Sequence, residues 1–487
     1  MSFADVTELF DSSTDLRQEA SKMYSFKRDF YYDVESALNA KTPVTALIGP
    51  RKCGKTVCLH QIEQSFTRAV YYDVKRLTDD ERVTLKNNVC SSIRNNEKII
   101  YLIDEVTYWM YPDSIIELFA DMYSETQNQN TKLVLAGSQS RALECWCRRS
   151  FAGNANFIRM SFLDYSEWLR YTEKSASVES YDQFLFEIDD FYGMGSLQDY
   201  LQGCLDETVV SNSKASEIVI NNDCDLISVS LLLDVLYIVL VSRHNRINAK
   251  TFTDEELLQS DIRYFFQEAY SYEVIERTEI FLLQRYKALK GANLQAIRQA
   301  MCFLYNCGLI SITYTVSSLN HEINAHDMLF NDSIFEREVQ SKTAFFRRFN
   351  FSIRHPMFYI AVLKLMLLDD IPKQLPKDLL GSLVECHIRG LMPEAYSCEY
   401  HDNNDNEVDY LNQSYGVAIE VTVSDKKMNR THFDCVLECP LKILTTKTQL
   451  ESQGSVYKIP YFIFIEFISR RYKYIPDLQG LINSLFK

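Results

Sequence analysis

The residues with the clearest chemical potential form a short loop bounded by two glycines near the N-terminus. Gly49, Gly54, Lys55 and Thr56 follow the spacing Gly-x-x-x-x-Gly-Lys-Thr, directly after the apolar run Val44–Ile48 and before a helical pattern. Glycines let successive backbone N–H groups curl around a phosphate, and the N-terminus of the next helix adds its dipole. The spacing therefore predicts a phosphate-binding loop of the Walker A type. A plain glycine turn before a helix is the disfavoured alternative.

The polar side chains of this loop have roles that follow from phosphoryl transfer. Lys55 is expected to bridge the β- and γ-phosphates of ATP, and the Thr56 hydroxyl is expected to hold Mg²⁺. ATP and Mg²⁺ are accordingly the expected cofactors. The predicted nucleotide-binding residues are Gly49, Pro50, Arg51, Lys52, Cys53, Gly54, Lys55, Thr56 and Val57.

Two further strand patterns end in polar residues that suit the same chemistry. Asp104 and Glu105 follow an apolar run, as a Walker B element requires. Asp104 is expected to be a metal residue that orients the water shell of Mg²⁺, and Glu105 to polarise the attacking water. Ser138 follows another strand pattern where a γ-phosphate sensor would lie, although an ordinary turn accounts for it equally well. The predicted catalytic residues are therefore Lys55, Glu105 and Ser138.

Alternating strand and helix patterns must position these residues. Apolar runs separated by helical patterns predict a parallel α/β sheet covered on both faces, over roughly the first third of the chain. The expected strands are Val44–Ile48, Ala69–Asp73, Lys98–Ile103, Lys132–Ala136 and Phe157–Phe162.

Two further regions with different secondary-structure patterns follow the alternating segment. Helical runs over Thr253–Ile310, a strand over Leu309–Val316 and a return strand near Ile323–Phe330 predict a winged helix. Within it, the helix Asn293–Tyr305 carries Gln295, Arg298 and Gln299, which either face DNA or pack against neighbouring elements. A last helix and four strands are expected at Lys377–Leu391, Glu407–Leu411, Val417–Val423, Leu441–Thr446 and Ile459–Phe467.

Composition limits the class of protein. The chain has 487 residues, 46% hydrophobic, with a net charge of −15, which excludes wholesale disorder and a general polyanion binder. The N-terminus has no secretory pattern, and the apolar stretch Ile227–Val241 contains Asp234 and is too short to span a bilayer, so a buried helix is expected. The 13 Cys lack metal-site spacing. A cytoplasmic protein without membrane contact is predicted.

With these residues in hand, the chain resembles a prokaryotic group of AAA-type P-loop ATPases. The similar segments in the first half are the phosphate loop, the Tyr72-Asp73 strand end, Asp104-Glu105, Gly137-Ser138 and the stretch from Phe151 to Glu167. The family usually has Gly-Arg where this chain has Gly153-Asn154. The resemblance therefore leaves three candidates for an arginine that acts on ATP: Arg148, Arg149 and Arg159.

In that family the ATPase domain is followed by a winged helix and a C-terminal domain like PD-(D/E)xK nucleases. Leu380–Glu385, Glu407–Tyr410, Ile419–Val421 and Tyr457–Phe464 resemble the helix, acidic strands and closing strand of that domain. The resemblance implies a nuclease-like site at Glu385, Asp409 and Glu420. Position 422, where a nuclease needs lysine, is Thr422. Lys426 or Lys427 would have to substitute, so a degenerate fold used for binding or scaffolding is favoured over an active nuclease.

The expected architecture is thus α/β: a P-loop parallel-sheet ATPase domain, a helical and winged-helix middle, and an α/β restriction-endonuclease-like C-terminal domain. The predicted divisions are 1–170 for the ATPase, 171–250 for a helical lid or linker, 251–335 for the winged helix and 336–487 for the nuclease-like domain.

Three functions remain open at this point. The first is an ATPase acting as a nucleotide switch on a nuclease-like domain, the second an ATP-regulated, metal-dependent DNA nuclease. The third is a slow nucleotide-sensing interaction protein. ATP is the expected small-molecule partner, and DNA, a protein partner or self-association are the candidate macromolecular contacts.

Overall fold

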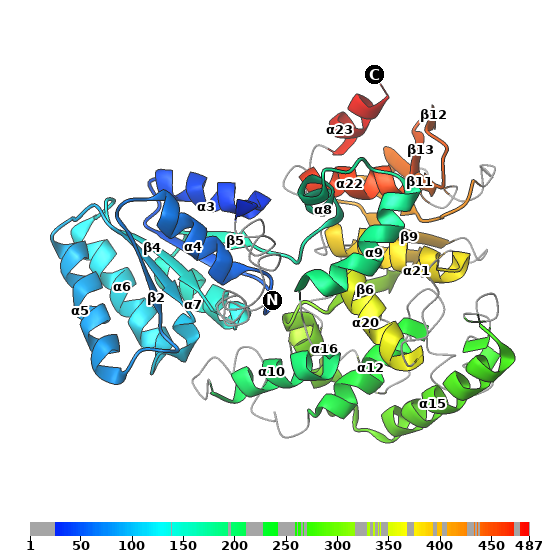
Figure 1. The fold of residues 1–487 in the computed structure, drawn as a ribbon, viewed down its shortest axis with the longest axis horizontal. Helices are drawn as coiled ribbons and strands as arrows, with labels where there is room; N and C mark the ends of the chain where they lie inside the picture. Colours follow the sequence, from blue (N-terminus) through cyan, green and yellow to red (C-terminus); the bar gives the residue numbers. More distant parts are fainter. Residues whose placement is uncertain are drawn as a thin grey trace, which may run out of the picture. The chain divides into compact units, whose positions relative to one another are not determined.

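The computed structural model, shown in Figure 1, falls into two compact units, each built from two stretches of the chain. The first unit is Met1–Leu163 with Phe191–Asp225, and the second is Asp164–Asp190 with Leu226–Lys487. The structure describes residues 25–137, 139–192, 196–210, 227–241, 259–260, 262–263, 266, 270–316, 329–331, 335–336, 339, 341, 349–367, 375–392, 397–401, 407–425, 433, 436, 439–471 and 478–486.

The first unit is built on a five-stranded parallel sheet in the order β2-β3-β4-β1-β5. The strands are β1 (Val44–Ile48), β2 (Ala69–Asp73), β3 (Ile100–Asp104), β4 (Lys132–Ala136) and β5 (Ala155–Arg159). β1, β2 and β4 have the predicted bounds, whereas the ends of β3 and β5 differ from the predicted ones by one to three residues. The parallel α/β core expected from the sequence is confirmed for this part of the chain.

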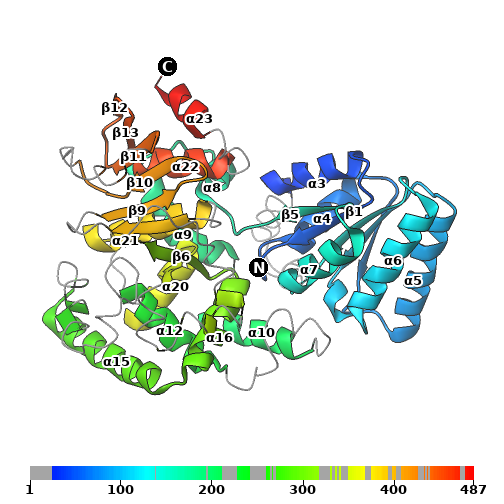
Figure 2. The same ribbon diagram turned by 180° about the vertical axis from the view of Figure 1, so that it is seen from behind.

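Helices cover both faces of this sheet, as Figures 1 and 2 show. They are α3 (Asp29–Asn39), α4 (Lys55–Ser65), α5 (Asp79–Arg94), α6 (Pro112–Thr126) and α7 (Ser140–Phe151). Ala46, Ile103 and Leu135 share a core with residues of α5, α6 and α7. The side chains that alternate with them, Leu47 and Leu102 among these, are also fully buried and face α3 and α4. Burial on both faces explains why the strands are continuous apolar runs.

The second unit contains an eight-stranded mixed sheet in the order β12-β13-β11-β10-β9-β8-β6-β7. Its strands are β6 (Ile310–Val316), β7 (Phe349–Ile353), β8 (Ser397–His401), β9 (Glu407–Asn412), β10 (Val417–Glu420), β11 (Leu441–Thr446), β12 (Glu451–Gln453) and β13 (Val456–Pro460). Its longer helices are α12 (Val229–Val241), α15 (Tyr272–Gly291), α16 (Leu294–Asn306), α20 (Pro356–Leu367), α21 (Lys377–Leu391), α22 (Tyr461–Arg471) and α23 (Leu478–Leu485).

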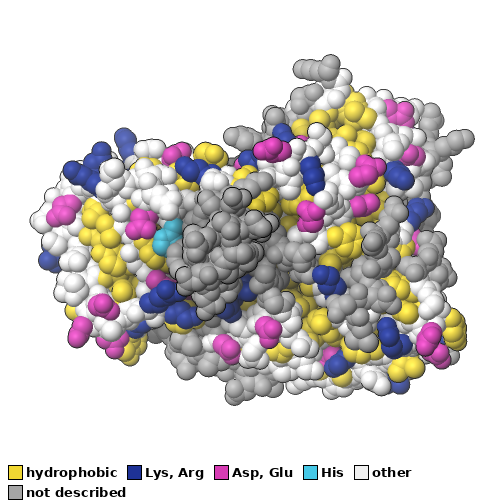
Figure 3. Space-filling model, in the orientation of Figure 1, with side chains coloured by type: hydrophobic (Ala, Val, Ile, Leu, Met, Phe, Trp, Pro, Cys, Tyr) yellow, Lys and Arg dark blue, Asp and Glu magenta, His cyan; other side chains and the backbone are white. Residues whose placement is uncertain are grey.

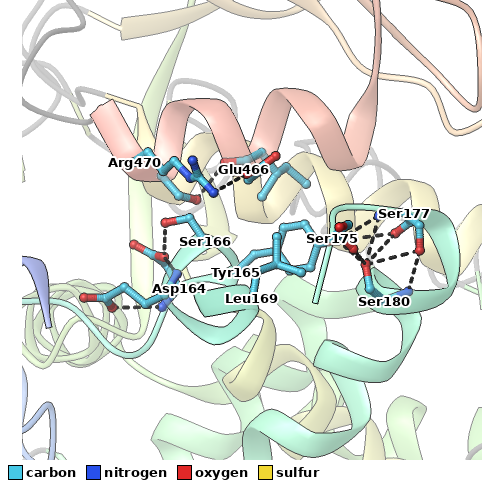
Figure 4. A network of polar contacts seen from close by, with 12 residues as sticks. Asp164, Tyr165, Ser166, Leu169, Ser175, Ser177, Ser180, Glu466 and Arg470 are labelled. Atoms are coloured by element: carbon cyan, nitrogen blue, oxygen red, sulfur yellow. Dashed lines mark hydrogen bonds and ion pairs between the residues drawn. The ribbon is translucent and has the colours of Figure 1, made fainter. Parts of the chain in front are cut away.

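The segment that directly follows the first sheet packs in the second unit. It forms α8 (Tyr165–Thr172) and α9 (Val178–Tyr192). Asp164 caps α8 in a reciprocal capping box with Glu167, and Figure 4 shows this cap beside the Glu466–Arg470 ion pair of α22, whose closest atoms are 2.7 Å apart. Figure 4 also shows Ser175, Ser177 and Ser180 gathered at the start of α9. The next helix, α10 (Leu197–Val210), belongs to the first unit again.

The winged-helix prediction differs from the observed pairing. β6 has nearly the predicted bounds, but its antiparallel partner is β7, and its other neighbour is β8 of the same sheet. In the predicted return strand, residues 323–328 lie outside the described residues, while Leu329 and Phe330 are helical. The predicted division at residue 335 therefore falls between two hydrogen-bonded strands.

Two sequence expectations within the second unit are corrected and one is confirmed. The strand predicted for Ile459–Phe467 ends at Pro460, because buried Tyr461, Phe464, Ile465 and Ile468 have the spacing of one helix face in α22. The predicted strand Val417–Val423 ends at Glu420. The apolar run Ile227–Val241 forms the buried helix α12, as expected. In the described part of the chain, no helix is long and apolar enough to cross a bilayer.

Candidate functional site

The phosphate loop connects β1 to α4 and depends on its two glycines. A side chain at Gly49 would place its Cβ 2.5 Å from the carbonyl oxygen of Met160 and 2.9 Å from Cys53 Sγ. Gly54 has a φ of 97°, in the left-handed region, and forms the N-cap of α4. Among the described residues no side chain caps α4, so the first backbone N–H groups of this helix remain able to bind an anion.

The Lys55 ammonium lies inside the curve of this loop. Its Nζ donates to the carbonyl oxygens of Gly49 at 2.9 Å and Pro50 at 2.8 Å, and the residue is 7% exposed. Two neutral carbonyls hold a cation less strongly than phosphate oxygens do. The Lys55 side chain is therefore placed to exchange these carbonyls for the β- and γ-phosphates of a nucleotide.

The two acidic residues predicted from the sequence lie beside the loop. Thr56 Oγ1 donates to Asp104 Oδ2 at 2.6 Å, and the backbone N–H of Glu105 donates to Asp104 Oδ1 at 2.9 Å. Asp104 is buried, and this burial, followed by the nearby charge of Glu105, raises the pKa of its carboxyl. Glu105 is half-buried with a left-handed φ of 50° at the end of β3. The Thr56–Asp104 contact brings the predicted Walker A and Walker B elements together.

A tyrosine that the sequence reasoning missed completes the surroundings of Asp104. The Tyr71 hydroxyl, from the adjacent strand β2, donates to Asp104 Oδ2 at 3.1 Å. Burial, followed by the charges of Asp104 and Asp73, raises the pKa of Tyr71, so the phenol keeps the proton that it donates.

Serine and arginine residues also brace the loop. Ser140, the first residue of α7, has its Oγ 2.9 Å from the Gly49 nitrogen and 2.5 Å from the Gly49 oxygen. The predicted sensor Ser138 lies outside the described residues. Arg28 donates through Nη1 to the Cys53 carbonyl at 2.9 Å and through Nη2 to the Phe162 carbonyl at 2.8 Å. Ser140 and Arg28 belong to no motif, and only the Ser-x-Ser spacing after β4 hinted at the former.

The loop residue Arg51 lies against α10. A Cβ added at Gly203 would be 1.7 Å from Arg51 Nη1, so the guanidinium occupies the space that this glycine leaves. Lys52 has a left-handed φ of 60°. Of the remaining predicted loop residues, Cys53 is fully buried, whereas Pro50 and Val57 are half-buried.

The three arginines proposed to act on ATP all form ion pairs within the first unit. Arg148 and Arg159 both donate to Glu144 Oε1, at 2.8 Å and 2.6 Å. Arg149 pairs with Glu117 at 3.2 Å. None of these contacts is with the phosphate loop.

Two of the three carboxylates of the predicted nuclease-like site have internal partners. Asp409 Oδ2 accepts from the Val421 backbone N–H at 2.7 Å, and Glu385 forms a buried ion pair of 2.6 Å with Arg389. Glu420 is half-buried at the end of β10. Among the described residues, no three His, Cys, Asp or Glu side chains are grouped so that they could hold a metal ion.

The residue at the lysine position of such a site is also engaged. The Thr422 backbone N–H donates to Thr445 Oγ1 at 2.7 Å, and Thr445 Oγ1 donates back to the Thr422 carbonyl at 2.8 Å. Lys426 and Lys427, the suggested substitutes, lie outside the described residues.

Packing also accounts for the polar residues of α16. Arg298 and Gln299 are 4% and 5% exposed. Arg298 donates to the Leu329 carbonyl at 2.9 Å and lies 4.1 Å from the centre of the Phe335 ring. Of the three residues considered for reading DNA, these two pack internally, as the alternative predicted.

The donor set beside the phosphate loop fits a magnesium nucleotide. Hydroxyl and carboxylate oxygens such as those of Thr56 and Asp104 are the ligands and outer-shell partners that Mg²⁺ prefers. The uncapped N-terminus of α4 and the Lys55 ammonium match phosphate in charge and donor type.

A comparison with known protein families covers the part of the chain that contains this site. Residues 41–169 match the model of a protein family described as an AAA domain. The matched segment contains the phosphate loop, the Asp104-Glu105 strand end and all five strands of the first sheet. An AAA-type α/β domain thus occupies the N-terminal part of the chain.

No curated protein matches the chain. Among solved structures, AMPPCP-bound DnaA from Aquifex aeolicus is 14% identical, with 55% of this chain and 88% of that chain covered and a TM-score of 0.26. A Thermotoga maritima RuvB mutant is also 14% identical, with 58% of this chain and 88% of that chain covered and a TM-score of 0.23. A DnaA bound to AMPPCP and single-stranded DNA is 14% identical, with 55% and 95% covered and a TM-score of 0.26.

Proposed function

We propose that this protein is a Mg²⁺-dependent ATPase whose first unit binds and hydrolyses ATP as a nucleotide switch. The observation that carries the proposal is the 2.6 Å hydrogen bond from Thr56 to Asp104 beside the Lys55 ammonium. Thr56 and Asp104 are 48 residues apart in the sequence, and the sheet order places β3 two strands from β1. The fold thus brings these two residues together from distant parts of the sequence, which supports a shared site.

Each residue has a defined task in this proposal. Lys55 and the backbone N–H groups at the start of α4 bind the β- and γ-phosphates. Thr56 and Asp104 hold Mg²⁺, which when bound neutralises charge on the phosphates. Glu105 orients the attacking water and accepts its proton. The backbone N–H of Glu105 donates to Asp104 Oδ1 and helps to hold the metal carboxylate, while the Glu105 side chain acts on the water.

The switch function rests on how the chain passes between the units. It leaves the first unit after Leu163, returns at Phe191 and leaves again after Asp225. Arg28 joins the phosphate loop at Cys53 to Phe162, two residues before α8 and its cap begin at Asp164. In this proposal, a change in the loop on nucleotide binding reaches Phe162 through Arg28, next to the point where the chain leaves the first unit.

For the second unit we favour a binding or scaffolding role over cleavage. Asp409 and Glu385 are engaged with internal donors, and Thr422 carries no charge to activate water. On the face shown in Figure 3, acidic and basic side chains are interspersed over the described part of this unit, without an extended basic field. DNA and a protein remain the candidate partners.

The test is ATP turnover with and without single- and double-stranded DNA, with cleavage followed in the same tubes. Lys55→Ala should abolish nucleotide binding and turnover, whereas Lys98→Ala, at an exposed lysine before β3, should leave both unchanged. Turnover that survives in Lys55→Ala would contradict the proposal. Metal-dependent DNA cleavage that is lost in Asp409→Ala would favour the nuclease instead.

A further inference from the structure

We propose that Tyr71 is a positioning residue for the magnesium carboxylate Asp104. This inference rests on the proposed ATPase function. Asp104 Oδ2 accepts two hydrogen bonds, from Thr56 Oγ1 at 2.6 Å and from Tyr71 at 3.1 Å, while Oδ1 accepts from the Glu105 N–H at 2.9 Å. Of these three donors, only Tyr71 lies outside the predicted Walker elements.

Tyr71 is itself held in place from two directions. Its backbone lies opposite Leu102 in the pairing of β2 with β3. Its N–H donates to Glu63 Oε1 at 3.3 Å, and Glu63 Oε2 is 3.2 Å from His60 Nδ1. The His60 ring packs on the Tyr71 ring with centroids 4.1 Å apart. The orientation of the phenol is therefore determined before any ligand binds.

His60 and Glu63 belong to the same helix that begins with Lys55 and Thr56. α4 thus supplies the Thr56 hydroxyl in its first turn and, about one and two turns later, the His60 and Glu63 side chains that hold Tyr71. A shift of α4 moves both donors to Asp104 together. Side chains of α4 and β2 thus surround the Asp104 carboxylate at the end of β3.

An outer-shell carboxylate acts by accepting hydrogen bonds from the ligands of the metal, so its orientation sets how well they are held. A carboxylate oxygen accepts at two positions, and Tyr71 fills one of those on Oδ2. Without the hydroxyl, only the Thr56 hydroxyl and the Glu105 N–H hold the Asp104 carboxylate, and in the proposed site the Thr56 hydroxyl turns to Mg²⁺. The loss then falls on Mg²⁺ affinity, while the Lys55 contacts with phosphate remain.

The experiment measures the binding of a fluorescent ATP analogue to the full chain, first in EDTA and then across a Mg²⁺ titration. Tyr71→Phe keeps the ring and its packing on His60 but removes the hydroxyl. We expect its Mg²⁺ half-saturation to rise about tenfold, with nucleotide affinity in EDTA equal to wild type. Tyr72→Phe is the matched control, because the adjacent ring stacks on Tyr101 with centroids 6.3 Å apart and should titrate like wild type.

The possible results distinguish the positioning role of Tyr71 from the proposed ATPase function. If Tyr71→Phe has the wild-type Mg²⁺ half-saturation, or weakens binding in EDTA to the same degree, the positioning role is overturned while the ATPase proposal stands. If the wild-type chain binds no nucleotide at all, both fall. A selective rise in the Mg²⁺ requirement supports the positioning role.

Discussion

In both units acidic side chains stand at or near the ends of buried strands, but their partners differ. Asp104 accepts from the hydroxyls of Thr56 and Tyr71, beside the Lys55 ammonium and an uncapped helix N-terminus. Asp409 instead accepts from the backbone N–H of Val421, which directly follows β10. The Thr56 and Tyr71 hydroxyls can rotate toward a new acceptor, whereas the Val421 N–H is fixed in direction by the backbone and is already used by Asp409.

The carboxylate of Glu385 in the second unit also differs from that of Asp104, because an internal arginine neutralises its charge. Glu385 and Arg389 are 6% and 2% exposed and pair with each other one helical turn apart. The Glu385 carboxylate therefore lies against a buried internal cation, and removing either partner would leave the other charge buried without its counter-ion. Acidic residues at strand ends therefore indicate a catalytic site only where mobile donors and a phosphate-binding loop surround them.

The largest expected effect is on the chemistry of the first unit. Glu105→Gln should lower ATP turnover by about 10²- to 10⁴-fold with nucleotide binding retained, because the amide cannot accept a proton from water. Single-turnover hydrolysis and equilibrium binding measure the two quantities. Asp409→Asn, the corresponding change in the second unit, should leave turnover unaltered. A fall of only a few-fold in Glu105→Gln would contradict the assigned role.

The next effect is on the stability of the second unit. Glu385→Ala leaves Arg389 buried without its carboxylate, and breaking a buried pair costs about 3–5 kcal/mol. Chemical denaturation should show this loss. Glu466→Ala, which removes the more exposed pair with Arg470, should cost at most about 1 kcal/mol. Equal losses in the two variants would show that the Glu385–Arg389 pair has no special structural importance.

Acid should destabilise the second unit through a buried histidine. Burial, and then the neighbouring His355, holds the pKa of His387 well below its ordinary value of 6.5, and His387 Nδ1 lies 2.9 Å from the Tyr181 hydroxyl. The folded state stays neutral while the unfolded state takes up a proton, so stability is lost as pH falls below about 6.5.

The expected slope is up to about 1.4 kcal/mol per pH unit between pH 6.5 and 5.5, above the range in which most carboxylates titrate. His387→Gln should flatten it, since an amide has no proton to gain. Urea unfolding at several pH values gives the slope. The same slope in both proteins would assign the effect to other groups.

The smallest effect concerns Gly203. Gly203→Ala places a methyl group where the Arg51 guanidinium lies, and this flexible group can move aside. ATP affinity should fall a few-fold, while the free energy of unfolding stays equal or rises by about 0.5–1 kcal/mol, because alanine favours a helix. Gly291→Ala, in α15 with no atom within 4 Å, is the control and should change only stability. Unchanged ATP affinity in Gly203→Ala would show that the Arg51 position does not matter.

Several features of the first unit were predictable from the sequence. Three of its five strands have the predicted bounds, because a parallel strand buried on both faces is a continuous apolar run. The phosphate loop and the Asp104-Glu105 strand end were predictable for a different reason, the local spacing of their residues. Their chemistry requires particular residue types at short, invariant spacing.

The sequence was less informative about the second unit. The apolar run after Pro460 is compatible with a strand or a helix, and the packing of Phe464 and Ile468 on one buried face decides for a helix. Likewise β6 looked like half of a local hairpin. Its partners β7 and β8 come from later in the chain, and local sequence patterns do not predict pairing between distant strands.

By itself, the sequence determined which residues were candidates for the proposed chemistry: a glycine-bounded loop, the Thr56 hydroxyl and two carboxylates, which stand out because the motif rests on local spacing. Only the tertiary structure decided which other groups serve that site. Tyr71, Arg28 and Ser140 reach it through hydrogen bonds that depend on strand order and helix packing. The tertiary structure also decided that Asp409 and Glu385 contact internal groups of the second unit. The partners of a carboxylate are the groups that the folded chain brings within about 3 Å of it, and local sequence does not specify them.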